Sequence, residues 1–79
     1  MEKIVVIPRV QVIMAFIATC IEATARKLNI SYHEVFQRMK RLDMIEKYIF
    51  PNYEALHTES RENLVMDIIE YMEQKEARI

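Results

Sequence analysis

The sequence predicts an all-α fold: a compact bundle of four or five helices around a central apolar helix at about residues 9–28, with an apolar N-terminal arm. Apolar side chains recur at steps of three and four through most of the chain, which is the helical period. The residues from 10 to 21 carry no charge. Only the run Ile-Val-Val-Ile at residues 4–7 has the β-branched composition of a strand.

A chain of 79 residues predicts one domain, with the arm at residues 1–8 and a helical core at residues 9–76. A lone strand needs a neighbour to satisfy its backbone. We therefore expect the arm to lie across the bundle, although pairing with a strand of another chain is the alternative. Pro8 suits the first turn of the next helix, where its missing N–H costs nothing.

The central helix is apolar almost all round, which is typical of the middle of a bundle or of a membrane span. A span needs about 20 apolar residues, and Arg9 and Glu22 interrupt this run on either side. We therefore expect no membrane span, and with a single cysteine and no targeting signal we expect a cytoplasmic protein. Steps of three and four place one set of residues on the inward face: Val10, Ile13, Met14, Ile17, Cys20, Ile21, Thr24 and Leu28.

Capping residues predict where the second helix begins. Ser31 and Glu34 form a capping box, and Ile30 and Val35 form the hydrophobic staple around it. Asn29 tolerates a left-handed conformation and can close the preceding helix. The second helix is therefore expected to follow Ser31 directly and to form a tight hairpin with the first.

The rest of the chain predicts two short helical turns and one long helix. Asp43 repeats the capping pattern before residues 44–48, and a further turn is expected at residues 52–56. Thr58 is the predicted N-cap of a last helix at about residues 59–75. The inward stripe of that helix is Leu64, Val65, Ile68, Ile69, Tyr71 and Met72.

Composition favours a protein with a partner. Apolar residues make up 52% of the chain, which is more than so small a core is expected to bury. Residues 1–41 hold seven Lys or Arg against three Glu, whereas residues 42–79 hold four against nine Asp or Glu. This asymmetry fits two solvated faces, an anionic partner, or a head-to-tail homo-oligomer.

Catalytic and cofactor signals are weak. The chain has no glycine, which excludes a Gly-rich phosphate loop. Neither His33 nor His57 has a second His or Cys at a metal-ligand spacing, and Cys20 lies on the apolar face of a helix. His57 is expected to pack or cap rather than to act as a base. We therefore expect no enzyme activity, no cofactor and no metal site.

Residues 25–41 also resemble the middle of a helix-turn-helix, which makes DNA binding the alternative function. Against it, the preceding helix is long, and Asn29 stands where such motifs prefer glycine. Basic side chains are few for a protein that gains affinity by neutralising phosphates. The possible nucleic-acid face consists of His33, Gln37, Arg38, Lys40 and Arg41.

The C-terminal third carries a Tyr-x-x-Leu-His-Thr segment followed by an acidic helix. In this setting the chain resembles a family of short all-helical bacterial proteins of unknown function, over roughly residues 16–72. The residues that carry the motif here are Tyr53, Leu56, His57, Thr58, Arg61, Glu62 and Asp67. Where family members often have glycine, this chain has Ser60.

The resemblance implies a genomic neighbourhood rather than a mechanism. Such proteins are often encoded beside proteins with features of ADP-ribosyltransferases, an arrangement similar to a toxin and its small partner. We therefore expect a non-catalytic protein–protein interaction module, with an antitoxin-like or accessory role toward such a neighbour. Its expected partners are another protein, a second copy of itself, or both.

Overall fold

The computed structural model describes residues 8–78, and within that range the chain forms five helices and no strand. The helices are α1 (Arg9–Leu28), α2 (Tyr32–Arg41), the π-helical turn η1 (Ile45–Ile49), α3 (Tyr53–Leu56) and α4 (Arg61–Glu76). The predicted all-α bundle around a central helix is confirmed. The predicted arm lies outside the described residues except for Pro8.

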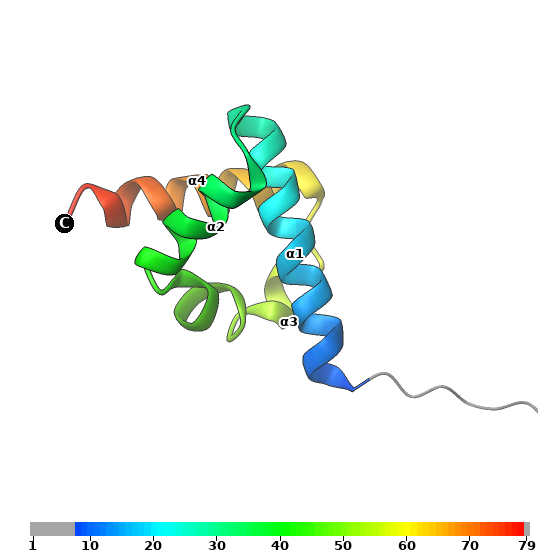
Figure 1. The fold of residues 1–79 in the computed structure, drawn as a ribbon. Helices are drawn as coiled ribbons and strands as arrows, with labels where there is room; N and C mark the ends of the chain where they lie inside the picture. The colour runs from blue at the N-terminus through cyan, green and yellow to red at the C-terminus, as the bar shows by residue number, and fades with distance from the viewer. Residues whose placement is uncertain (1–7, 79) are drawn as a thin grey trace, which may run out of the picture.

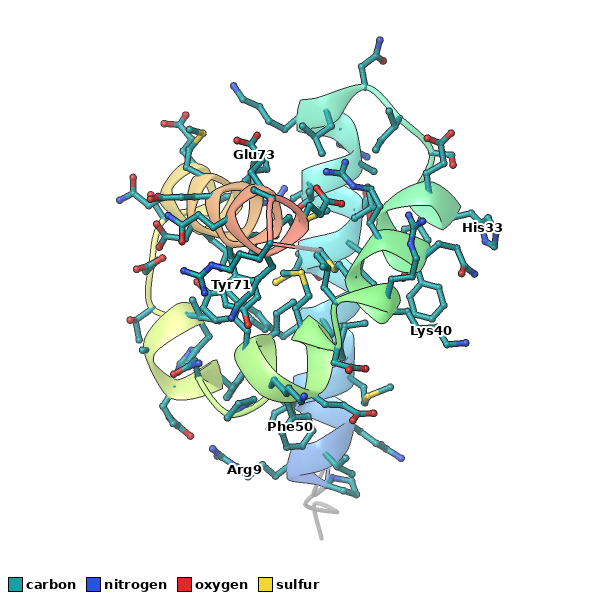
Figure 2. All side chains as sticks on the ribbon, turned by 90° about the vertical axis from the view of Figure 1, so that its left-hand side faces the viewer. Arg9, His33, Lys40, Phe50, Tyr71 and Glu73 are labelled. Carbon is teal, nitrogen blue, oxygen red and sulfur yellow. The ribbon has the colours of Figure 1, made fainter. Side chains whose placement is uncertain are left out.

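Helix α1 is the axis of the molecule, and both α2 and α4 pack against it (Figure 1). Helix α4 crosses the C-terminal half of α1, while η1 and α3 link the end of α2 to the start of α4. Viewed along α4, α1 stands between α4 and α2 (Figure 2). No helix within residues 8–78 is long and apolar enough to span a bilayer.

The core combines the inner faces of all these helices. Cys20 is fully buried, and burial raises the pKa of its thiol to about 12, so the sulfur behaves as a small apolar group. The Tyr48 and Tyr71 rings stack with centroids 4.1 Å apart, which joins η1 to α4. The largest fully buried side chains are Met39, Met44, Ile49, Ile68, Met72, Val35, Thr24 and Cys20.

The turn between α1 and α2 forms as predicted. Asn29 adopts the left-handed conformation with φ 56° and ψ 44°, and the N–H of Ile30 donates to the carbonyl of Ala25 at 3.1 Å. The Ser31 hydroxyl accepts the backbone N–H of Glu34 at 3.0 Å. The sequence predicts Pro8 within the first turn of α1, but it is the N-cap, the residue just before the helix. Its carbonyl accepts the N–H of Gln11.

Two predicted N-caps are wrong. Asp43 has φ 53° and lies in a left-handed conformation, and its carbonyl accepts the N–H of Lys47 at 3.0 Å, but the N-cap of the next helix is Met44 and no side chain caps it. The short helix then occupies Ile45–Ile49, and the N–H of Phe50 donates to the carbonyl of Ile45. Helix α4 is capped by Ser60, whose hydroxyl accepts the N–H of Asn63 at 3.2 Å. Thr58 instead donates its hydroxyl to the carbonyl of Ala55 at 2.8 Å.

Candidate interaction surface

The inward face of α1 continues beyond the helices that cover it. Val10 and Met14 follow the same steps of three and four as the buried Ile17 and Ile21, yet they are 52% and 57% exposed. The prediction that these two side chains are buried is therefore wrong, because α2 and α4 pack further along α1 (Figure 1). We call Val10 and Met14 the uncovered α1 face.

Motif residues of the C-terminal third form an aromatic stack beside that face. The Tyr53 ring lies edge-on to Phe16 of α1, with centroids 5.2 Å apart, and stacks on the His57 ring at 4.6 Å. The guanidinium of Arg9 lies over Tyr53 and forms an ion pair with Glu54. A hydrogen bond from Arg9 lowers the pKa of the Glu54 carboxyl below its ordinary value. The stack thus holds α3 against the first half of α1.

The contacts of Leu56, Thr58 and His57 are structural. Leu56 is only 5% exposed and belongs to the core. The Thr58 hydroxyl closes the end of α3 through its bond to Ala55. The Nε2 atom of His57 lies 3.7 Å from a carboxylate oxygen of Glu54. These contacts are those of a packed turn that positions the start of α4.

The remaining motif residues separate into two places. Arg61 and Glu62 face the end of α1 across a groove. Asp67 lies on another side of α4, beside Tyr48. A hydrogen bond shared with Asp67 raises the pKa of Glu59, and burial followed by the charge of Asp67 raises the pKa of Tyr48. The motif is therefore contiguous in sequence but not one site in space.

A groove of about 520 Å³ lies between the last turns of α1 and the first turns of α4. A smaller hollow of about 140 Å³ continues it along α1 toward Thr19 and Glu22. Met66 is 56% exposed at its edge, whereas Val65 is buried at its base. We call this feature the α1/α4 groove, and it is lined by Ala23, Arg26, Lys27, Arg61, Glu62, Val65 and Met66.

The charge at the α1/α4 groove is mainly positive. Arg26 pairs with Glu22 at 2.8 Å, but no ion pair to Lys27 or Arg61 is found within residues 8–78. The N-terminal end of α4 adds the positive end of its helix dipole at Arg61. Glu62 is the opposing charge on the α4 side.

The residues proposed for a nucleic-acid face divide between two environments. His33 and Lys40 project outward from α2 in Figure 2, and Arg41 is exposed as well. Gln37 is half-buried. Arg38 points to α4 instead, and its Nε and Nη2 atoms donate to Glu76 at 2.8 and 2.7 Å.

The bond from Arg38 to Glu76 changes the titration of both groups. It raises the pKa of Arg38 and lowers the pKa of Glu76, while partial burial opposes both shifts. The positive charge of Arg38 is therefore matched inside the protein. Among the residues described, no three His, Cys, Asp or Glu side chains converge as the ligands of a metal ion would.

Sequence reasoning missed the α1/α4 groove because its two walls are far apart in the chain. The sequence places Arg26 and Lys27 in the helix-turn-helix-like segment at residues 25–41, and Arg61 in the C-terminal motif. Met66 was not singled out, although it is apolar on a helix face that also carries Glu62 and Glu70. That isolated apolar residue was the available signal.

A family described as "Protein of unknown function (DUF3791)" matches residues 15–75. The match begins after the first turns of α1 and ends within the last turn of α4. It therefore covers the α1/α4 groove and the aromatic stack except Arg9, and it omits Val10 and Met14. No curated protein and no solved structure matches the chain.

Proposed function

This chain belongs to that family of unknown function, and we propose that it is a non-catalytic protein–protein interaction module. The observation that carries the proposal is the uncovered α1 face. Val10 and Met14 continue a buried stripe into solvent, at 52% and 57% exposure. Burying each of these side chains against a partner would contribute roughly 1–2 kcal/mol, which gives association a driving force at this end of α1.

The uncovered α1 face is also suitable for docking because its backbone is already helical. Val10 and Met14 lie on a 20-residue helix whose other half is fixed in the core. The aromatic stack and the Arg9–Glu54 pair hold the adjoining side of the helix against α3. A partner would therefore meet a helix that is already ordered, which lowers the entropic cost of binding.

The finer proposal is an antitoxin-like or accessory role toward a toxin-like protein encoded nearby. The exposed apolar side chains on α1 support a role in binding another protein. Co-expression with the neighbouring gene product tests this role. The expected result is a complex that survives size-exclusion chromatography and relieves growth inhibition by the neighbour. If the two proteins form no complex and growth inhibition is not relieved, the antitoxin-like role is rejected.

A matched pair of variants links that result to the uncovered α1 face. Val10→Glu/Met14→Glu should abolish the complex, because it places two carboxylates in the apolar contact. Gln11→Glu/Ala15→Glu adds the same charge at exposed positions of the same helix with the same spacing. This control should retain the complex. If both variants lose the complex to the same extent, the loss is due to the added negative charge and not to the uncovered α1 face.

DNA binding remains a second candidate because one face of α2 carries exposed basic groups. His33 and Lys40 project outward from α2 (Figure 2), and Arg41, the next residue after Lys40, is exposed as well. On this proposal, the protein is retained on duplex DNA at low salt and released as salt rises. Lys40→Ala/Arg41→Ala should then shorten the retention. Passage of the wild-type protein through the column without retention at low salt would reject it.

A further inference from the structure

The α1/α4 groove has the chemistry of a peptide-docking site, and we propose that it binds a short amphipathic helix that carries carboxylates beside two apolar side chains. This inference rests on the proposed interaction function and names one class of partner segment. The groove has an apolar centre at Ala23, Val65 and Met66 and a basic rim at Arg26, Lys27 and Arg61.

Charge complementarity determines the sign of the partner. Lys27 and Arg61 are exposed, and neither side chain takes part in an ion pair within residues 8–78. The positive end of the α4 dipole lies at Arg61. Carboxylates that flank the apolar side chains of a partner would lie near Lys27, Arg61 and the N-terminal end of α4.

The length of the groove determines the size of the partner segment. The α1 wall runs from Thr19 to Lys27, which corresponds to a rise of about 12 Å along a helix. About two helical turns fit against such a wall. Apolar side chains three or four residues apart on the partner would both reach the groove and pack on Met66 and Ala23.

Three other occupants fit less well. A small molecule would lack orienting contacts, since the groove is open and its polar groups lie at the rim. Nucleic acid would lay a continuous row of phosphates along the groove and across Glu22 and Glu62, whereas a peptide can place its few carboxylates at Lys27 and Arg61. A second copy would have to offer its own acidic side of α4, where Glu62, Glu70 and Glu73 surround Met66. That side borders the groove itself, so a symmetric pair would bring like charges together.

The test uses the purified full chain as bait for a phage-displayed library of random peptides of about 16 residues. The expected outcome is enrichment of acidic peptides with two apolar residues one helical turn apart. Their affinity should fall by about tenfold or more for Lys27→Gln/Arg61→Glu. Lys40→Gln/Arg41→Glu makes the same change in net charge on α2 and should change the affinity by less than about twofold. Thermal unfolding checks that both variants are folded.

Several outcomes would overturn the proposal. These are enrichment of neutral or basic peptides, no enrichment, self-association that excludes peptides from the groove, or equal weakening by both double variants. Amide NMR shifts on addition of an enriched peptide locate the site, with Ala23 and Met66 expected to shift most. Shifts centred on Val10 and Met14 would reject the groove but keep the interaction function. The co-expression experiment tests that function independently of any peptide.

Discussion

At the scale of single residues, Thr24 combines full burial with an unsatisfied hydroxyl. Its Oγ1 atom is the buried side-chain oxygen in residues 8–78 that lacks a hydrogen-bond partner. Val has the same shape without that polar group, so Thr24→Val should raise the free energy of unfolding by about 1 kcal/mol. Thr19 is exposed and bonds to the carbonyl of Ala15. Thr19→Val should therefore change stability by less than about 0.5 kcal/mol.

Urea unfolding followed by circular dichroism measures both threonine variants. A less stable Thr24→Val protein would show that the hydroxyl has a partner that stabilises the fold. A large change in the free energy of unfolding for Thr19→Val would show that the exposure of a threonine in α1 does not predict the effect of replacing it.

Ser60 and Thr58 give a second residue-scale prediction. Ser60→Ala removes the hydroxyl that accepts the N–H of Asn63, so it should cost about 1 kcal/mol of stability. Thr58→Ala removes only the exposed bond to Ala55 and should cost less, about 0.5 kcal/mol. The order of the two melting temperatures is the measurement. A greater loss for Thr58→Ala would contradict the start of α4 at Arg61.

Local chemistry explains which caps the sequence predicts and which it does not. Ser31 has a unique partner in Glu34 and follows Asn29, so its role is unambiguous. Thr58 and Ser60 are both hydroxyl residues before the same helix, and propensity alone does not choose between them. Asp43 is equally suited to an N-cap and to a left-handed turn. The structure shows the second of these, with φ 53°.

At the scale of helices, the Arg38–Glu76 pair fastens the end of α4 to α2. The hydrogen bond from Arg38 holds the pKa of Glu76 below its unfolded value. The pair therefore stabilises the fold above the unfolded carboxyl pKa, and this contribution disappears as pH falls through the lowered pKa. Glu76→Gln should cost about 1 kcal/mol near neutral pH, since the pair is partly exposed.

The pH dependence distinguishes this pair from a general charge effect. The stability difference between wild type and Glu76→Gln should shrink toward zero as the pH falls through the lowered pKa of Glu76, because the carboxyl then becomes protonated in the folded state as well. Glu46 is exposed and forms no ion pair among the described residues, so Glu46→Gln is the control. A difference that stays constant through the whole acid range in which the folded protein can be measured would contradict the role of the Glu76 charge.

Helix periodicity predicts the direction of a face but not how much of it is covered. The steps of three and four on α1 correctly predict that Ile13, Ile17 and Cys20 are buried. They assign Met14 to the same side, where it is 57% exposed. Coverage depends on where α4 crosses α1, which is a tertiary property without a local sequence signal. The α1/α4 groove depends on the same crossing.

At the scale of the whole molecule, the central claim is that a partner covers the uncovered α1 face. The apolar excess in the sequence predicts exposed apolar side chains, and Val10 and Met14 are two such side chains, at 52% and 57% exposure. Partner identity is not encoded in the fold of this chain, because the same apolar contact can be satisfied by many proteins. An experiment in the cells that produce the protein is therefore the most direct one.

The measurement is affinity purification of the tagged chain from those cells, with the eluate quantified by mass spectrometry and its mass measured by light scattering. We predict one co-eluting protein in a fixed ratio to the wild type and to Gln11→Glu/Ala15→Glu. The same protein should be missing from folded Val10→Glu/Met14→Glu. A wild-type chain that elutes alone, as a monomer or as a homo-oligomer, would contradict the claim, as would equal recovery of the partner on all three proteins.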